Sequence, residues 1–509
     1  MKVQHIGYWL TKRKELHAAK EAVVDGERRL SYGELENKTN QLAQGLQQLG
    51  VKHGDRCAIL AYNCLEYVMA IFAAAKLGVI LVPLNWRLSI PELAFNLNDS
   101  GTETIIFDNT FEDTALSLQE QSTIQKMIAL GDPVSSTATS LEALLVSQSA
   151  EPPQSDQEID LDTPHIIMYT AGTTGKPKGA ILSQGASFYN AINLMVDMQF
   201  GPDDRNLSVL PMFHIGGIGL FTLPILYVGG TVVIQRTFEP AETLRLLKSE
   251  NINLFFGVAA IFLFLIQHND FKAAAFNNVR VVMSGGAPLP VSLVKQYHEA
   301  GIILRQGFGM SEAAPSIATL SEALALKKAG AIGRPLMHVE ARVVNENMQT
   351  VARGQTGELI IRGPNLMQGY WNRPEATQEA FAGGWFHTGD LAQMDADGDL
   401  TIVDRKKDMF ISGGENVYPA EVENAIYDLP QVAEAAVIGV TDENWGEVGY
   451  AMVVLKPNEA ISEDEVLMFL SDRLARFKVP KRVAFMDHLP RNAAGKVLKN
   501  ELREQFSKK

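Results

Sequence analysis

The feature that most constrains this fold is an alternation of short apolar segments with longer amphipathic ones, which continues up to Val403. One unit is clear, because a strand is predicted over Arg56–Leu60, a helix over Tyr67–Leu77 and a second strand over Val79–Val82. This order is typical of a βαβ unit, whose two strands lie parallel. The sequence therefore predicts an α/β fold with layered lobes built on parallel sheets.

Two stretches depart from this alternation. Residues 133–163 are rich in Ser, Gln, Asp and Pro, and we expect them to form a surface excursion between two lobes. From Gly333 to Val403, short strands with glycine-rich turns indicate a β-rich subdomain. The charged run Asp404–Asp408 then separates this subdomain from the remaining residues.

A smaller pattern begins after the charged run. Helices are predicted over Pro419–Tyr427 and over Ser462–Ala475, the second opened by a capping box, with strands at Ala435–Val440 and Tyr450–Leu455. These segments indicate a compact α+β unit. Since one core stops growing at about 250–300 residues, a chain of 509 residues also requires several domains. We expect a large N-terminal adenylation domain over residues 1–403, a hinge over 404–408 and a small mobile C-terminal lid domain over 409–509.

Charge and cysteine content exclude several classes of protein. The chain has 45 basic and 59 acidic residues, and a net charge of -14 argues against nucleic-acid binding. Cys57 and Cys64 are too few for a disulfide framework or a four-ligand zinc site, so we expect free buried thiols in a reducing cytosol. The N-terminus lacks a signal-peptide core, and glycines and Pro224 interrupt the uncharged stretch Ile215–Gln235. We expect a cytoplasmic protein; a transient peripheral association with membranes and a homodimer are left open.

The segment Tyr169–Ala180 combines glycines, threonines and lysines directly after the apolar run Ile166–Met168. Glycines let a backbone approach a ligand closely, and consecutive N–H groups can surround an anion. The spacing is not that of a Walker A loop, because Gly175 and Lys176 are followed by Pro177. Taken alone, the segment fits either a phosphate-binding loop or a solvated surface turn.

Further segments share this composition. Ser284–Pro288 and Gly307–Glu312 are interpreted as turns that follow apolar strands, where open α/β sheets bind ligands. His387–Asp390 is interpreted as a tight turn that carries a carboxylate. Beyond the charged run come the turn Ser412–Asn416 and the loop Arg491–Lys496, which holds one lysine.

Together and in this order, these segments resemble the adenylate-forming enzymes, specifically the acyl-CoA synthetases, and the resemblance extends from Leu30 to Arg503. It implies that a small-molecule carboxylic acid is joined to AMP from ATP with loss of pyrophosphate. Coenzyme A then displaces AMP to form a thioester. A reaction of such polyanions needs preorganised positive charge and N–H donors, with Mg²⁺ offsetting the phosphates. The implied ligands are therefore ATP, Mg²⁺ and coenzyme A.

The resemblance also implies roles for single residues. The β and γ phosphates would be held by a loop that comprises Thr170, Gly172, Thr173, Thr174, Gly175 and Lys178. Adenine would be flanked by Gly286, Ala287, Pro288 and Phe308, and the same nucleotide site would include Gly307, Gly309 and Met310. Ser311 and Glu312 match the residues that meet the α phosphate and the metal, and Thr170 is the second expected metal ligand. Asp390 would accept both ribose hydroxyls.

The remaining roles imply movement of the small domain. Arg405 would touch ribose or phosphate, and Lys407 occupies the hinge position. Lys496 would reach the α phosphate and the substrate carboxylate in the first step, whereas Gly413 and Gly414 would line a tunnel for coenzyme A in the second. We therefore expect the small domain to rotate about Lys407 between half-reactions. The expected catalytic residues are Lys496, Glu312, His214 and Thr170.

The identity of the acid rests on the residues after Phe213. Amino-acid-activating relatives carry an Asp where this chain has His214, so an acid without an amino group is favoured. His214 either gates the acyl pocket or packs in the core. The expected acyl pocket comprises His214, Gly216, Gly257, Gly285 and Gly309. Such small or apolar residues favour a medium- or long-chain fatty acid.

Other acids and reactions remain open at this stage. A coumarate- or benzoate-type aryl acid is the alternative, because an apolar slot binds a ring equally well. A carrier-loading acyl-AMP ligase and a luciferase-like oxidation of the adenylate share the scaffold. A non-catalytic nucleotide sensor is opposed by the presence of both Lys496 and Glu312.

Overall fold

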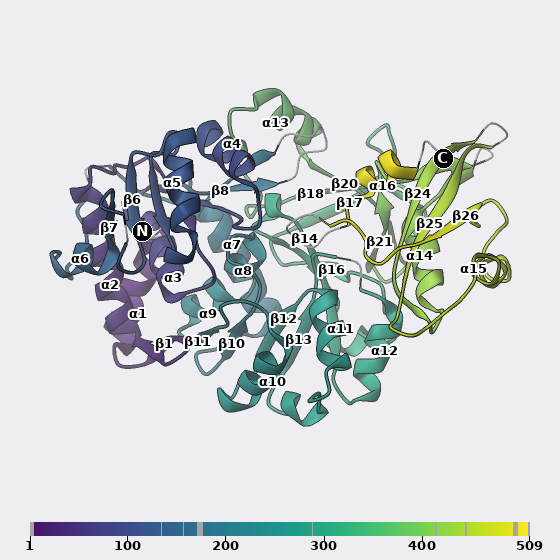
Figure 1. Ribbon diagram of the computed structural model, residues 1–509, viewed down its shortest axis with the longest axis horizontal. Helices are drawn as coiled ribbons and strands as arrows, with labels where there is room; N and C mark the ends of the chain where they lie inside the picture. The colour runs from purple at the N-terminus through teal and green to yellow at the C-terminus, as the bar shows by residue number, and fades with distance from the viewer. Residues whose placement is uncertain are drawn as a thin grey trace.

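The structure is a computed structural model, and it describes residues 5–133, 135–155, 157–170, 177–287, 289–412, 415–442, 445–491 and 497–506. Two large sheets of eight and nine strands form the N-terminal part of the chain. A four-stranded antiparallel sheet lies between them and the C-terminal five-stranded sheet, at the right of Figure 1. This arrangement confirms the predicted α/β fold class with a large and a small domain.

The first large sheet has the order β19-β9-β8-β4-β3-β5-β6-β7. The strands from β8 to β7 are parallel, and β9 and β19 continue the sheet in antiparallel pairing. The predicted βαβ unit is present as β3, α3 (Leu65–Leu77) and β4. Its strands are the predicted ones within a residue or two, because burial on both faces makes them continuous apolar runs. The strand bounds are β3 (Arg56–Leu60), β4 (Ile80–Pro83), β5 (Thr104–Phe107), β6 (Lys126–Ala129), β7 (Ala138–Ser140), β8 (Pro164–Thr170), β9 (Lys178–Ser183) and β19 (Gly369–Tyr370).

The expectation that residues 133–163 form only a surface excursion is wrong for residues 138–146. There β7 adds the edge strand of the sheet, and α6 (Leu141–Val146) buries three leucines against α2 (Tyr32–Gln48). The approach is close, since a Cβ built on Gly45 would lie 2.6 Å from the Leu144 side chain. A three-residue strand and a six-residue helix are too short to show a hydrophobic period, so local patterns do not indicate them.

The second large sheet has the order β16-β15-β14-β13-β12-β10-β11-β1-β2. The strands from β14 to β1 are parallel, and antiparallel strands close both edges. The uncharged stretch Ile215–Gln235 contains β11 together with two short helices. Among the described residues, none of the helices has the length and hydropathy of a membrane-spanning segment. The strand bounds are β1 (Glu21–Asp25), β2 (Arg28–Ser31), β10 (Arg205–Ser208), β11 (Thr231–Ile234), β12 (Leu254–Gly257), β13 (Val281–Ser284), β14 (Leu304–Gly309), β15 (Ser316–Thr319) and β16 (Arg334–Pro335).

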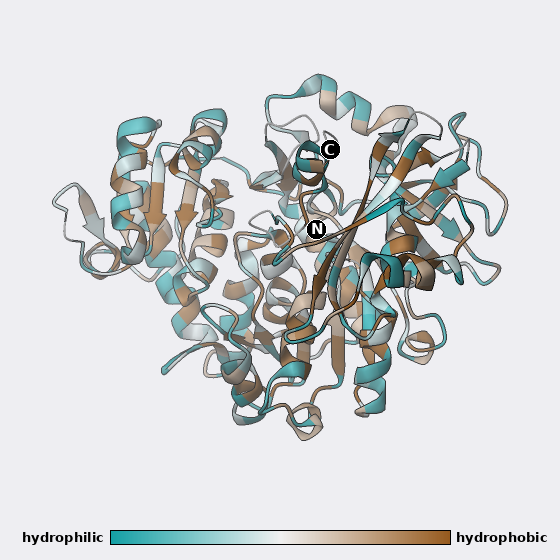
Figure 2. Cartoon of the chain, turned by 45° about the vertical axis from the view of Figure 1, so that its right-hand side comes forward, coloured by the Kyte–Doolittle hydropathy of each residue, from teal (hydrophilic) through white to brown (hydrophobic). Residues whose placement is uncertain are grey.

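Helices fill the space between the two sheets and cover their outer faces. The largest apolar cluster joins both sheets through helices between them, and Figure 2 shows the hydrophobic strands enclosed by helices with hydrophilic outer faces. A second cluster lies under the helices on the outer face of the second sheet. The inner helices include α1 (Gly7–His17), α2, α3, α7 (Gln184–Met198), α8 (Ile215–Gly219) and α9 (Thr222–Val228), and the outer ones are α10 (Pro240–Ser249), α11 (Ala259–Gln267) and α12 (Val291–Glu299). On the first sheet, α4 (Ile90–Ser100) and α5 (Glu112–Gln121) contribute to a third cluster.

The predicted β-rich subdomain is the four-stranded antiparallel sheet β17-β18-β20-β21. Its last strand continues to Arg405, so it crosses the residue at which the domain boundary was predicted. The boundary and the hinge therefore stay predictions. The bounds are β17 (Glu340–Val344), β18 (Gly357–Arg362), β20 (Phe386–Met394) and β21 (Leu400–Arg405), with α13 (Pro374–Ala380) between β19 and β20.

The C-terminal sheet has the order β23-β22-β25-β24, with β26 parallel to β25. It has its own apolar cluster, and for this reason the sequence pattern indicates a separate compact unit here. The second predicted helix begins at its capping box but ends at Ser471, four residues before the predicted end. The bounds are β22 (Phe410–Ser412), β23 (Glu415–Val417), α14 (Pro419–Tyr427), β24 (Val432–Asp442), β25 (Gly446–Leu455), α15 (Glu463–Ser471), β26 (Arg482–Phe485) and α16 (Lys499–Phe506).

Candidate active site

The two ends of the predicted phosphate loop are the two strands of a hairpin. The last residue pair of β8 and β9 is Thr170 with Lys178, and the Thr170 hydroxyl donates to the Lys178 carbonyl at 3.4 Å. The hairpin thus brings together two residues that the sequence assigned to the phosphates. The intervening residues of that prediction, Gly172, Thr173, Thr174 and Gly175, lie outside the described residues.

Tyr370 connects this hairpin with Glu312. The Lys178 ammonium lies 5.3 Å from the centre of the Tyr370 ring, and the Tyr370 hydroxyl donates to Glu312 Oε1 at 3.0 Å. Burial, and then the negative charge of Glu312, raise the pKa of Tyr370 well above its usual value, so the hydroxyl keeps its proton. Sequence reasoning missed Tyr370, because its place in the site follows only from the pairing of β19 with β9.

The segment Gly307–Gly309 is part of strand β14, which corrects its interpretation as a turn after a strand. It lies between β13 and β15, and a Cβ built on Gly309 would lie 2.1 Å from the Pro315 carbonyl oxygen. The glycine is therefore required by close backbone approach rather than by a turn. The short 3₁₀ helix η3 (Ser311–Ala313) follows, so Ser311 and Glu312 lie just beyond the end of the strand with half-buried side chains, as Phe308 and Met310 also are.

The segment Ser284–Ala287 does form a turn directly after a strand, as predicted. Gly286 has a φ of 79°, and a Cβ built on Gly285 would lie 2.9 Å from the Gly307 carbonyl oxygen. The two glycine-rich segments expected around the nucleotide therefore lie side by side. Ala287 is exposed at the turn, and Pro288 lies outside the described residues.

Asp390 lies within strand β20, so the interpretation of His387–Asp390 as a tight turn is also wrong. Antiparallel pairing places Asp390 opposite Arg405, and the Arg405 guanidinium lies 2.6 Å from Asp390 Oδ1. The strand, rather than a turn, presents this carboxylate, whose residue is only 2% exposed. The structure thereby brings together two predicted nucleotide ligands, and Lys407 follows in an exposed turn.

Three predicted residues of the C-terminal domain, namely Lys496, Gly413 and Gly414, lie outside the described residues. The chain on either side of Lys496 is anchored, since Arg491 and Val497 form a β-bridge and Lys499 pairs with Glu423 at 2.8 Å. The roles assigned to these three residues stay predictions.

The acyl side begins at His214, which precedes helix α8. The Phe213 and His214 rings are 4.6 Å apart. Burial, and then the positive charge of Arg87, lower the pKa of His214 to about 4, so its ring is neutral at physiological pH. In the part of the chain that the structure describes, His214 Nε2 is buried without a hydrogen-bond partner. His214 is therefore a neutral ring rather than a paired charge.

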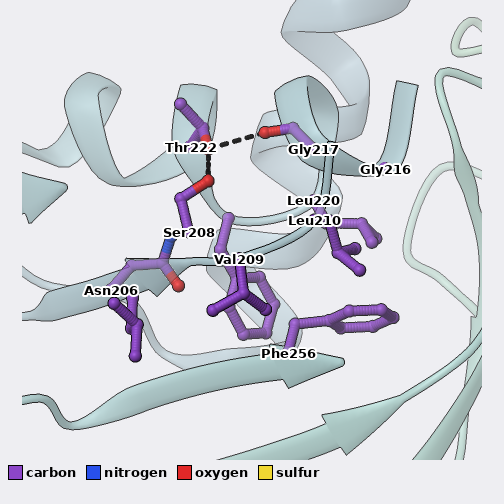
Figure 3. Close-up of a pocket in the computed structure, with 11 residues that line it drawn as sticks. Asn206, Ser208, Val209, Leu210, Gly216, Gly217, Leu220, Thr222 and Phe256 are labelled. Atoms are coloured by element: carbon purple, nitrogen blue, oxygen red, sulfur yellow. Dashed lines mark hydrogen bonds between the residues drawn. The ribbon is translucent and has the colours of Figure 1, made fainter. Parts of the chain in front are cut away.

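A small cavity of about 10 Å³ lies beneath α8 (Figure 3). A Cβ built on Gly216 would lie 3.4 Å from the Leu220 side chain and 3.5 Å from that of Leu210, so Gly216 leaves space there. On one side of the cavity, the Ser208 and Thr222 hydroxyls share a hydrogen bond at 3.3 Å. The wall on the other side is Phe256, whose ring tip would lie 3.1 Å from a Cβ on Gly285.

The expected acyl residues therefore lie near one edge of the second sheet. Gly257 ends β12, Gly285 follows β13 and Gly309 ends β14, and these strands are parallel. The carboxyl ends of parallel strands lie at one edge, where α/β sheets bind ligands. Phe256 links this edge to Gly216, so the structure assembles the predicted acyl residues beside the predicted nucleotide residues.

The donor groups of the cleft fit Mg²⁺. Glu312 supplies a half-buried carboxylate and Thr170 a hydroxyl, both hard oxygen ligands. A bound Mg²⁺ would offset phosphate charge there. Another carboxylate cluster, formed by Asp395, Asp397 and Asp399, is already bonded to the Lys328 ammonium at 2.6, 2.8 and 2.6 Å. That cluster is therefore part of an ion-pair network, which joins the turn between β20 and β21 to the segment between β15 and β16.

Comparisons with known proteins show the family of the chain. The family described as AMP-binding enzyme matches residues 10–371, and its C-terminal domain family matches residues 421–496. The chain is 40% identical to a feruloyl-CoA synthase of Amycolatopsis sp, covering 99% of this chain and 100% of the relative. It is 37% identical to a long-chain-fatty-acid–CoA ligase of Mycobacterium tuberculosis, covering 99% of each.

A solved structure of a synthetase is similar over nearly the whole chain. The o-succinylbenzoate coenzyme A synthetase of Bacillus subtilis in complex with ATP and magnesium ion superposes with a TM-score of 0.86 at 33% identity, covering 97% of this chain and 99% of that one. An acid–thiol ligase of this kind uses ATP, Mg²⁺ and coenzyme A. From its matched sequence families and its full-length relatives, the chain belongs to the adenylate-forming superfamily as an AMP-forming acyl-CoA synthetase.

Proposed function

We propose that this acyl-CoA synthetase activates an aryl acid of the cinnamate or benzoate type. The observation that carries the proposal is the cluster of aromatic rings beside His214. Trp86 lies 5.9 Å from Phe213, which in turn lies 4.6 Å from the neutral His214 ring. Aromatic rings pair favourably in edge-to-face and offset geometries at such distances, so a planar substrate ring is a suitable occupant.

The small cavity under α8 supports the same choice. The cavity under α8 has only about 10 Å³, bounded by Leu210, Leu220 and Phe256. A long alkyl chain would have to displace all of this wall, whereas a ring placed near His214 would displace less of it. The full-length likeness to a feruloyl-CoA synthase adds to the argument.

A medium- or long-chain fatty acid is the second candidate, and it is the one that the sequence favoured. The relative of Mycobacterium tuberculosis supports it, because its identity is only slightly lower at the same coverage. The neutral His214 ring places no charge of its own against an alkyl chain.

The deciding experiment measures pyrophosphate release with a panel of acids, with and without coenzyme A. Ferulate, 4-coumarate, benzoate, hexanoate, decanoate and palmitate would be compared by kcat/KM. We expect the best aryl acid to exceed the best fatty acid by at least about tenfold, the discrimination that a pocket of fitted shape supplies. A fatty acid that exceeds every aryl acid would overturn the proposal and support the second candidate.

We also propose that the two domains alternate about residues 404–408. Asp404 accepts hydrogen bonds from the Arg405 and Ala420 N–H groups, and Arg503 pairs with Asp408 at 2.9 Å. Lys407, by contrast, is exposed and has no ion pair among the described residues. For Lys407→Pro we expect slower transfer to coenzyme A from supplied acyl-AMP, with pyrophosphate release less affected. Equal loss in both steps would contradict the hinge.

Peripheral membrane association, homodimer formation and a cytoplasmic location stay predictions. Sedimentation with lipid vesicles and light scattering of the purified protein test the first two directly. Retention of the protein in the soluble fraction without dimers would contradict both.

A further inference from the structure

Asp99 holds together two segments that border the phosphate-loop hairpin. It lies in the last turn of α4, and its side chain is 10% exposed. Its carboxylate accepts from the Tyr169 hydroxyl at 2.8 Å and from the Arg373 guanidinium at 2.6 Å. Its carbonyl accepts from the Trp371 indole at 3.1 Å. Tyr169 directly precedes Thr170, whereas Trp371 and Arg373 directly follow the strand that carries Tyr370.

The backbone of Tyr370 is fixed on both sides. The Tyr370 N–H donates to the Thr377 hydroxyl at 2.9 Å, and the Trp371 N–H donates to the Gly179 carbonyl at 2.7 Å. The Tyr370 ring therefore has little freedom between the Lys178 ammonium and the Glu312 carboxylate. One ring touches both a cation and a carboxylate that lie on different elements.

We propose that Tyr370 and Asp99 are positioning residues for the ATP-dependent half-reaction. Tyr370 fixes one oxygen of Glu312 and thereby orients this carboxylate, with its other oxygen left to meet a cation. Asp99 fixes the segment that presents Tyr370 relative to the end of β8. A group that is already oriented need not be ordered when charge develops, and this is the main source of electrostatic catalysis. The proposal goes beyond the choice of acid and holds for any acid that the enzyme accepts.

The first test is Tyr370→Phe, which removes one hydroxyl and keeps the ring. Outer-shell partners of a metal-binding carboxylate affect metal affinity or activity by about tenfold or more. We expect calorimetric titration with MgATP in the absence of acid to show about tenfold weaker binding, with pyrophosphate release reduced to a similar degree. Thioester formation from supplied acyl-AMP should change by less than about twofold, because that step does not need the phosphates of ATP.

The matched control is Tyr297→Phe. The Tyr297 hydroxyl is also buried and donates to the Phe262 carbonyl at 2.7 Å, but it belongs to the core-facing side of α12. Its loss removes a buried hydrogen bond of the same kind without touching the cleft. If the two variants have the same MgATP affinity, or if Tyr370→Phe slows both half-reactions equally, the proposal is overturned.

The second test is Asp99→Asn, with Asp204→Asn as its control. Asp204 is similarly buried and pairs with Arg280 at 2.5 Å. It lies just before the amino end of β10, whereas the site lies at the carboxyl ends of the parallel strands. We expect Asp99→Asn to weaken MgATP binding by about threefold to tenfold and Asp204→Asn to leave it unchanged. Because Asp99 acts through Tyr370, the double variant with Tyr370→Phe should lose less than the product of the two single effects. If the two losses multiply fully, Asp99 acts independently of Tyr370 and Glu312, and the role assigned to Asp99 is overturned.

Tyr169→Phe covers the case in which Asp99→Asn does not fold. It removes the 2.8 Å bond to Asp99 and leaves the Arg373 pair in place. MgATP binding weakened by about twofold or more would support the role of Asp99, and unchanged binding would contradict it.

Discussion

The nucleotide side and the acyl side of the candidate site are held together by different kinds of interaction. On the nucleotide side, Glu312 and Asp390 are carboxylates held by a tyrosine hydroxyl and an arginine, at 3.0 and 2.6 Å. On the acyl side, the described contacts around Gly216 are with leucine and phenylalanine side chains, and His214 is neutral. Directional bonds fix where charges lie, whereas apolar walls fix only which shapes are admitted. Changes on the first side should alter the rate with every acid, and changes on the second should alter which acid is chosen.

The largest expected effect is that of Asp390→Ala on the nucleotide side. The change removes the expected acceptor for the ribose hydroxyls and leaves the Arg405 guanidinium without this carboxylate. Hydrogen bonds to a charged group contribute about 1.5–3 kcal/mol each, so kcat/KM for ATP should fall at least about a hundredfold. Steady-state kinetics with several acids measure this, and the loss should be the same for each acid.

Asp397→Ala is the control, because this carboxylate lies in the turn of the same hairpin and its side chain is 67% exposed. It should leave kcat/KM for ATP within about twofold of the parent value, as surface changes usually do. A loss with Asp390→Ala that depended strongly on the acid would remove the distinction between the two sides.

The second effect is that of Gly216→Ala on the acyl side. The added methyl group would meet Leu220 at 3.4 Å and Leu210 at 3.5 Å, which is ordinary contact, so the fold should tolerate it. It fills space next to the cavity, and one methyl group in an apolar pocket changes discrimination by about tenfold. We expect kcat/KM for the bulkiest accepted acid to fall about tenfold relative to the smallest one, with the KM for ATP unchanged.

Gly201→Ala is the matched control, since a Cβ built there has nothing within 4 Å. It should leave the preference among acids unchanged. If Gly216→Ala changed the KM for ATP and left acid preference alone, the residue would belong to the nucleotide side instead.

The third effect concerns pH. The pKa of His214 falls from 6.5 in the unfolded chain to about 4 in the folded protein, so the unfolded state binds the extra proton first. The stability that this neutral histidine contributes is fully present above about pH 6.5 and is lost as the pH falls toward 4. Per pH unit in this window, the free energy of unfolding should decrease by up to about 1.4 kcal/mol from this residue.

Replacement by His214→Gln removes that contribution. Chemical denaturation between pH 7 and 4.5 should show a shallower decline for the variant than for the parent. Some decline should remain, because burial also lowers the pKa of His5 and of His165 to about 4. Identical slopes would mean that His214 is not held neutral, and the neutral histidine of the acyl side would be refuted.

The smallest effect is that of Arg245→Gln on the surface of α10. Arg245 pairs with Glu242 at 2.7 Å, a distance like those within the cleft, but the two side chains are 60% and 40% exposed. Solvent screens such pairs, so the free energy of unfolding should change by less than about 0.5 kcal/mol and the kinetics by nothing measurable. A large effect would show that proximity rather than burial gives the charged contacts of the nucleotide side their importance.

Much of this arrangement could be predicted from local patterns. The strand Arg56–Leu60, the helix Pro419–Tyr427 and the capping box at Ser462 all stand where the sequence placed them. Each depends on neighbouring residues only, because apolar runs and caps act within a few positions. Predictions failed where elements were short, as at α6, or where glycines are required by close packing, as at Gly309.

The sequence by itself determined the family chemistry, the α/β class and the residue types of the site, since these follow from ordered motifs and periodicity. Only the tertiary structure decided that Asp390 is presented by a strand and that Tyr370 lies between Lys178 and Glu312. The pairing of β19 with β9 joins residues far apart in the chain. No local pattern encodes such a pairing, because its stability comes from bonds and packing that exist only once both lobes have folded.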